Sequence, residues 1–145
     1  MRISAKSEYA IKAILGLAMQ APRELVPIQT IAGRQRIPQR YLEQVLLALK
    51  RSGLVTSKRG SAGGYHLSRP PDRITVGDVL RAVEGTSAPF EALTGRRPTA
   101  DGHDLAELWS DISEAVSSVV DRLTFGELAA RATERAGGAR AMYYI

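Results

Sequence analysis

Basic side chains at three places in the first half of this sequence have the chemistry to hold phosphate. Arg2 and Lys6 stand at the start of a helical pattern, where exposed backbone N–H groups would add to their positive charge. Arg40 belongs to the polar face of a later helical pattern, and Arg59 lies in a Gly-rich turn. Because guanidinium groups bind both phosphate oxygens and guanine edges, these positions predict a nucleic-acid partner. A frayed basic terminus is the alternative for Arg2 and Lys6.

The charge of the chain is divided unevenly along its length. Residues 1–74 hold 13 Lys and Arg against 4 Asp and Glu, net +9, whereas residues 75–145 hold 7 against 11, net −4. Such asymmetry predicts a polyanionic partner for the first half only. The alternative is an ordinary solvated basic face.

Two helical patterns separated by a few residues surround Arg40. Residues 38–52 begin with Pro38, which suits the first helical position, and Gly53 is placed to end the helix. Residues 27–35 give a shorter helix just before it. The core-facing stripe of the longer helix repeats at helical spacing: Leu42, Val45, Leu46 and Leu49. Two helices with so short a connection indicate a helix-turn-helix, although an amphipathic helix by itself is more often ordinary core.

A predicted β-hairpin follows directly. Residues 54–57 and 65–68 read as short strands, and the turn cluster between them, 58–64, carries Arg59 and Gly60. A basic hairpin after a helix-turn-helix is typical of a wing. We therefore expect a mainly α fold in which residues 1–84 form a winged helix-turn-helix for DNA binding, ending in a helix that begins with a Thr75–Asp78 capping box.

The second half predicts a loop followed by a long dimerisation helix. Residues 85–102 show no periodicity, and a connection of this length is commonly functional. Residues 103–135 contain the longest apolar pattern and then a short last helix; we expect Gly137 and Gly138 to end regular structure, leaving 136–145 as a tail. The stripe expected to meet its twin across a two-fold axis is Leu105, Trp109, Ile112, Val116 and Val119. Packing within its own chain only is the alternative.

The sequence contains no recognisable catalytic motif and no apolar segment long enough to span a membrane. The sequence has no cysteine, its two histidines, His66 and His103, belong to no triad, and the glycines of 60–64 lack the Lys-Ser/Thr of a phosphate-binding loop. No apolar stretch approaches a membrane span, and no secretory signal opens the chain. We expect a cytoplasmic protein that is not an enzyme.

Several short motifs follow one another along the chain: Met1–Ser4, Tyr41–Gln44, Gly53–Val55, Arg59–Gly60, Gly63–Tyr65, Arg69–Pro71, Ile74–Val79, Glu84–Gly85 and Leu108–Trp109. In these motifs and in their order, the chain resembles the Rrf-type winged-helix regulators of bacteria, the family that includes IscR, NsrR and CymR. The resemblance covers nearly the whole chain and implies dimeric transcription factors.

The resemblance also implies which side chains contact DNA. On the recognition helix, Gln39, Arg40, Tyr41 and Glu43 match the family's base-reading and backbone-contacting positions, and Arg59 and Gly60 match its wing. The chemistry suits this assignment, since Arg donates to guanine, Gln pairs with adenine and Glu accepts from cytosine.

Two departures from the family pattern bear on function. Arg36 stands where the family often has Gly, so the turn before the recognition helix must take a costlier conformation. Many relatives also carry three cysteines that hold an iron–sulfur cluster, and here Ala92, Arg97 or Pro98, and His103 occupy those positions. Because such clusters depend on thiolates, we expect no cluster.

A further hypothesis is that Glu8 and His103 form the remnant of a pocket for a metal or a small ligand. The alternative is that His103 is an ordinary capping or surface histidine.

The sequence as a whole predicts a dimeric, sequence-specific repressor with no cofactor, bound to double-stranded operator DNA and controlled by a small molecule or a protein partner. The competing hypothesis is a protein-interaction module on the same fold that binds DNA weakly.

Overall fold

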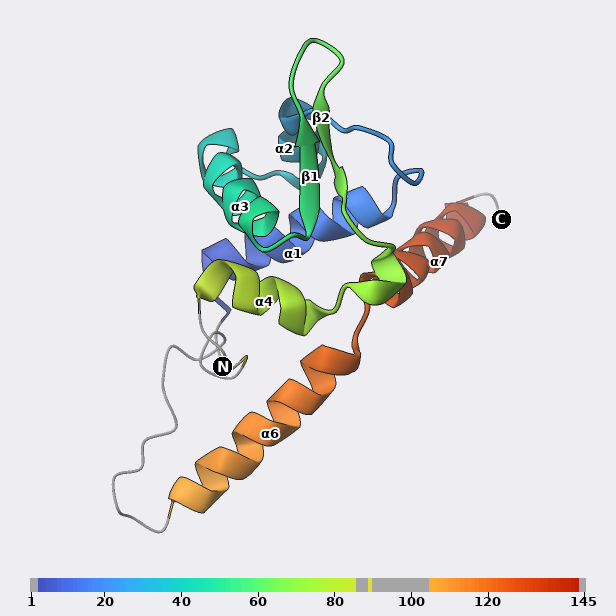
Figure 1. The fold of residues 1–145 in the computed structure, drawn as a ribbon. Helices are drawn as coiled ribbons and strands as arrows, with labels where there is room; N and C mark the ends of the chain where they lie inside the picture. Colours follow the sequence, from blue (N-terminus) through green and yellow to red (C-terminus); the bar gives the residue numbers. More distant parts are fainter. Residues whose placement is uncertain (1–2, 86–88, 90–104, 144–145) are drawn as a thin grey trace.

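The computed structural model describes residues 3–85, Pro89 and residues 105–143. Helices and one antiparallel hairpin make up this part of the chain, which confirms the mainly α winged helix-turn-helix (Figure 1). The elements are α1 (Ala5–Ala18), α2 (Ile28–Gln35), α3 (Gln39–Arg51), β1 (Val55–Lys58), β2 (Gly64–Leu67), the 3-10 turn η1 (Pro71–Arg73), α4 (Val76–Glu84), α6 (Ala106–Arg122) and α7 (Phe125–Tyr143). Within these residues, no helix combines the length and apolar character that a membrane crossing needs.

Local capping signals fix where the first helices begin and end. The Ser4 hydroxyl accepts a hydrogen bond from the Ser7 N–H at 3.1 Å, so it caps α1. Thr75 and Asp78 form both bonds of a capping box at the start of α4. Arg36 ends α2 with φ 53° and ψ 48°, a left-handed conformation that is less favourable for arginine than for glycine, in line with the costlier turn expected at this position.

One hydrophobic core joins the helix-turn-helix to the hairpin. The expected stripe of α3 is buried, and it packs with Ala10, Ile14 and Leu17 of α1 and with Ile74 and Val79 around α4. β1 pairs with β2 in a short antiparallel register from Val55–Leu67 to Lys58–Gly64. The hairpin is therefore anchored at its base in the core while its tip extends away from it (Figure 1).

The long helix α6 leaves this body and lies at the end of the molecule opposite the hairpin (Figure 1). Val120 is its one buried residue, packed against Leu80 of α4. Arg81 of α4 donates two hydrogen bonds to Asp121, at 2.8 and 2.7 Å, and these hydrogen bonds raise the pKa of the Arg81 guanidinium above its ordinary value.

The last helix is longer than the sequence indicated. α7 returns to the body through the fully buried Phe125 and then continues through Gly137 and Gly138 to Tyr143. The expectation that these glycines end regular structure is wrong. A glycine pair weakens a helix by only ~2 kcal/mol, which good helix formers around it offset. The remaining division of the chain into domains stays a prediction.

Candidate nucleic-acid interface

The start of α3 presents the four side chains predicted to contact DNA. Gln39, Arg40, Tyr41 and Glu43 are all exposed, and the side chain of Tyr41 keeps 54% of its surface accessible. They are exposed because the opposite stripe of the same helix fills the core, which fixes the rotation of α3 about its axis. A row of hydrogen-bonding groups therefore faces outward along the first two turns. The individual role of each remains a prediction.

Lys6 lies beside this row. Tyr9 of α1 packs against Tyr41 with ring centroids 6.2 Å apart, and Lys6, Tyr9, Tyr41 and Gln44 line a hollow of about 430 Å³ between α1 and α3. Tyr9 was not singled out in the sequence, and Gln44 appeared there only as the end of the Tyr41–Gln44 motif, because their position opposite each other arises only when α1 packs on α3. The hollow places a cation and two phenol groups next to the exposed start of α3.

The wing predicted around Arg59 and Gly60 is present. Both residues lie in the exposed tip between β1 and β2, and Gly60 has φ 110°, a conformation that residues with a side chain rarely adopt. Next to the tip, β2 is fixed by a bridge between Val26 and Tyr65, whose two backbone hydrogen bonds are each 2.9 Å long. A Cβ added to Gly64 would lie 2.6 Å from the Val26 carbonyl, so only glycine permits this bridge.

A second hollow joins the wing to the helix-turn-helix. Its volume is about 630 Å³, and Lys50, Lys58 and Arg59 contribute three positive charges to its lining together with the first residues of α2. Pro27 leaves the N-terminus of α2 without a side-chain cap, so N–H groups there are available to an anion. Lys50 and Lys58 were missed in the sequence. Lys58 was detectable as part of the basic turn, whereas only the packing of the hairpin beside α2 and α3 brings Lys50 to it.

The remaining predicted site residues do not form a metal centre in the described part of the chain. Arg2 and His103 lie outside the described residues, as do Ala92 and most of the 85–102 loop. Glu8 is exposed and pairs with Lys12 at 3.2 Å on the same helix face. No group of three or more His, Asp or Glu side chains with metal-binding geometry occurs among the described residues, and the sequence has no thiol.

The predicted dimer stripe of α6 is largely solvent-accessible in the single chain. Leu105, Leu108, Trp109 and Val119 are 54, 47, 38 and 50% exposed, and Ile112 and Val116 are half-buried. Contacts to α4 cover a different side of α6, through Val120 and Asp121. A row of large apolar side chains is therefore left on the surface, a feature that commonly marks an interaction site.

Comparison with known proteins agrees with this geometry. The profile of the Rrf2 family, described as iron-dependent transcriptional regulator, matches residues 3–131. The chain is 37% identical to the transcriptional regulator CymR of Bacillus subtilis over 129 residues, covering 89% of this chain and 90% of CymR. It is 38% identical to the regulator IscR of Aliivibrio salmonicida over 130 residues, covering 88% and 77% of the two chains.

Solved structures give the same result. The structure of CymR, the global cysteine regulator of B. subtilis, matches with a TM-score of 0.77 at 32% identity, over 90% of this chain and 98% of that one. T. potens IscR matches with a TM-score of 0.78 at 31% identity, over 93% and 90%. These relatives are regulators of transcription and not enzymes. Their similarity along most of the chain, together with the winged helix-turn-helix, means that this protein belongs to the Rrf2 family of helix-turn-helix transcriptional regulators.

Proposed function

We propose that this chain is a homodimeric repressor that binds double-stranded DNA of defined sequence through α3 and the wing. The observation that carries the proposal is the gathering of basic and hydrogen-bonding side chains at one end of the molecule. The exposed start of α3 and the two hollows lined by Lys6 and by Lys50, Lys58 and Arg59 all belong to the packed α1–α2–α3–hairpin unit. The relatives' role in transcription supports the same partner.

A division of labour among these side chains follows from their chemistry. Gln39, Arg40 and Glu43, exposed at the start of α3, suit hydrogen bonding to base edges in the major groove. Lys6, Lys50, Lys58 and the free N-terminus of α2 suit phosphates, which position the protein without reading sequence. Arg59, at the tip of the wing beside Gly60, suits the adjacent minor groove.

The dimer proposal rests on the apolar side chains that α6 leaves accessible. Two copies that cover Leu105, Trp109, Val119 and their neighbours would remove this surface from water, which is favourable by ~25 cal/mol per Å². A two-fold axis would also present two copies of α3 to two half-sites. Because α6 and the wing lie at opposite ends of the molecule, dimer contacts and DNA contacts would not compete (Figure 1).

The iron–sulfur centre of the family does not fit the residues of this chain. Its three cysteine positions hold no thiol, and Glu8 is engaged with Lys12. We therefore propose a regulator that works without such a cluster and responds to a small molecule or a protein partner, in the cytoplasm, where its DNA target would be.

The test compares a duplex taken from immediately upstream of the protein's own gene with a scrambled duplex of equal length, across a salt series. We expect the upstream duplex to bind at least ~10³-fold more tightly and log Kd to rise steeply with log salt concentration. An absorbance spectrum of the same sample should lack the visible bands of a cluster. Equal, weak binding to both duplexes would contradict sequence-specific binding and favour the protein-interaction module.

A further inference from the structure

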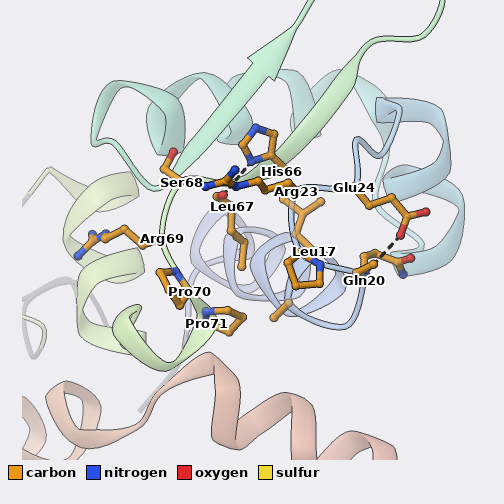
Figure 2. A pocket seen from close by; sticks show the side chains of 13 residues that line it. Leu17, Gln20, Arg23, Glu24, His66, Leu67, Ser68, Arg69, Pro70 and Pro71 are labelled. Atoms are coloured by element: carbon orange, nitrogen blue, oxygen red, sulfur yellow. Dashed lines mark hydrogen bonds between the residues drawn. The ribbon is translucent and has the colours of Figure 1, made fainter.

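A third hollow lies away from α3 and the wing tip, at the base of the wing. It has a volume of about 380 Å³, and its walls are the end of α1 with the turn that follows, residues 17–24, and the segment leaving β2, residues 66–71 (Figure 2). Sites for small molecules commonly occupy ~300–1,000 Å³. None of the DNA-contacting residues proposed above lines it.

The floor of this hollow is apolar and conformationally restricted. Leu17 is 5% exposed and belongs to the core, while Leu67 and Pro71 are half-buried. Pro70 and Pro71 have fixed φ angles, so the wall they form changes little on binding. A short carbon chain or ring is the kind of group that such a floor accepts.

The rim supplies positive charge. Arg23 and Arg69 line the hollow against the single carboxylate of Glu24. That carboxylate accepts a hydrogen bond from the Ala21 N–H at 3.3 Å, so it is used in closing the turn. Arg23 reaches from the turn toward His66 and Leu67 (Figure 2), and it makes no ion pair with any residue in the described ranges. An anionic group is the natural partner of this rim.

The backbone of Arg23 is a second sign of function. Its φ is 63°, in the left-handed region, which is unfavourable for a residue with a side chain and costs glycine little. Such conformations cluster at functional sites, where the side chain has a use that offsets the strain. Here the strained residue also brings a guanidinium group, without an ion pair among the described residues, into the hollow.

The ring of His66 is fixed at the edge of the hollow. Its Nδ1 lies 2.8 Å from the Leu67 carbonyl oxygen, and because that oxygen only accepts, Nδ1 must donate. His66 and Leu67 thus form a rigid side wall opposite Arg23.

We propose that this hollow binds a small organic acid, with the carboxylate held by Arg23 and the carbon chain against Leu17, Leu67 and Pro71. The Val26–Tyr65 bridge joins the segments that continue from its two walls, so an occupant that contacts both walls would restrict the position of the wing. That regulatory consequence rests on the proposed function; binding of the acid does not.

The experiment is a titration of the full-length protein with hexanoate, followed by ¹H–¹⁵N NMR in the absence of DNA. We expect saturable shifts of the backbone amides of the non-proline residues in 17–24 and 66–69. Hexanamide, which keeps the chain without the charge, and inorganic phosphate, which keeps a charge without the chain, should each bind at least ~10-fold more weakly. Equal binding of hexanamide or of phosphate, or shifts centred elsewhere in the protein, would overturn the proposal.

Variants of Arg23 distinguish weaker hexanoate binding from a general loss of folding stability. Arg23→Gly should weaken hexanoate binding at least ~10-fold while leaving Tm equal or higher, because glycine relieves the left-handed strain. Arg23→Lys keeps the charge and should retain most of the affinity, and Arg131→Gln should change nothing, because Arg131 is exposed on α7 and does not line the hollow. Full affinity in Arg23→Gly would refute the site. Because the titration contains no DNA, its failure would leave operator binding untouched, and failure of operator binding would leave the titration valid.

Discussion

Individual cations of this protein differ in what they are expected to recognise. Arg40 is exposed at the start of α3, where a long side chain reaches base edges in a major groove. Lys50 lies at the other end of the same helix and lines a hollow with the basic wing. A guanidinium reads guanine with two parallel hydrogen bonds, whereas an ammonium near phosphates contributes charge alone. We therefore expect Arg40, at the start of α3, to contribute sequence specificity, and Lys50, at its end, to contribute affinity for any DNA sequence.

Replacing these two residues tests that separation. Arg40→Ala should cost ~1–3 kcal/mol on the preferred duplex and relax the preference at one base pair, because direct readout is lost. Lys50→Ala should weaken all duplexes alike and lower the salt slope by about one unit. Fluorescence anisotropy over a set of single-base variants measures both, with Arg131→Ala as the charge-matched control. Identical behaviour of the Arg40 and Lys50 variants would contradict the assignment.

Gly64 is the position of β2 at which the close approach of Val26 leaves no room for a side chain. Gly64→Ala places its Cβ 2.6 Å from the Val26 carbonyl carbon and oxygen, and backbone atoms cannot rotate away, so we expect destabilisation of ~1–3 kcal/mol. Gly33→Ala is the matched control, because nothing lies within 4 Å of its Cβ and alanine favours a helix by ~1 kcal/mol. Thermal unfolding followed by circular dichroism should show opposite signs for the two variants. A stabilised Gly64→Ala protein would be inconsistent with the bridge.

Between elements, α4 connects the start of α1 to the long helix α6. At one end of α4, Glu84 accepts hydrogen bonds from the hydroxyls of Ser4 and Ser7, and the Ser7 side chain is fully buried. Along its length, Arg81 holds Asp121 of α6. The hydrogen bonds of Glu84 therefore hold the C-terminal end of α4, directly before Gly85, against the start of α1, the helix that contains Lys6.

The hydrogen bonds of Glu84 are expected to contribute to the stability of the folded protein. Glu84→Ala should destabilise the protein by ~1–3 kcal/mol, because it leaves the buried Ser7 hydroxyl without its acceptor. Ser7→Ala should cost less, and the double variant should cost less than the sum of the two, with a coupling of ~0.5–3 kcal/mol. Urea unfolding of the four proteins completes the cycle. Strict additivity would mean that the hydrogen bond contributes nothing measurable.

For the whole molecule, assembly is expected to depend on α6 and not on the DNA-binding end. Val119→Asp introduces a charge into the accessible apolar row, and desolvating that charge across an interface should dissociate the dimer. Ser118→Asp is the control, because it is the neighbouring exposed residue on the polar side of α6. Sedimentation velocity should find monomers for the first variant and dimers for the second, with equal helix content. A dimeric Val119→Asp protein would contradict the assignment of the dimer interface to α6.

Loss of the dimer should also change DNA binding in a defined way. A monomer keeps α3 and the wing but addresses one half-site at a time, so Val119→Asp should lose affinity for the full operator and keep its weak affinity for a half-site duplex. Comparing the two duplexes in the same salt checks this. Equal loss on both would point to damage of the DNA-binding unit itself.

Much of the fold was determined by the sequence, because its signals act over a few residues. Ser4 as the cap of α1, the Thr75–Asp78 capping box, the buried stripe of α3 and the hairpin around Gly60 are all patterns that span one to about four positions at a time. The exposed start of α3 follows from the same periodicity, since burying one face leaves the other in solvent. The end of α7 was mispredicted because a glycine pair is a weak signal.

Tertiary structure alone decided which distant residues share a surface. Lys50 joins the wing, Tyr9 meets Tyr41, Phe125 enters the core, and Arg23 meets His66 at the base of the hairpin, although nothing local marks these partners. The Glu84 bonds join residues 77 and 80 positions apart in the chain. The physical reason is that caps and periodicity set each element's own conformation, whereas hollows and contacts form only when packed elements exclude water together.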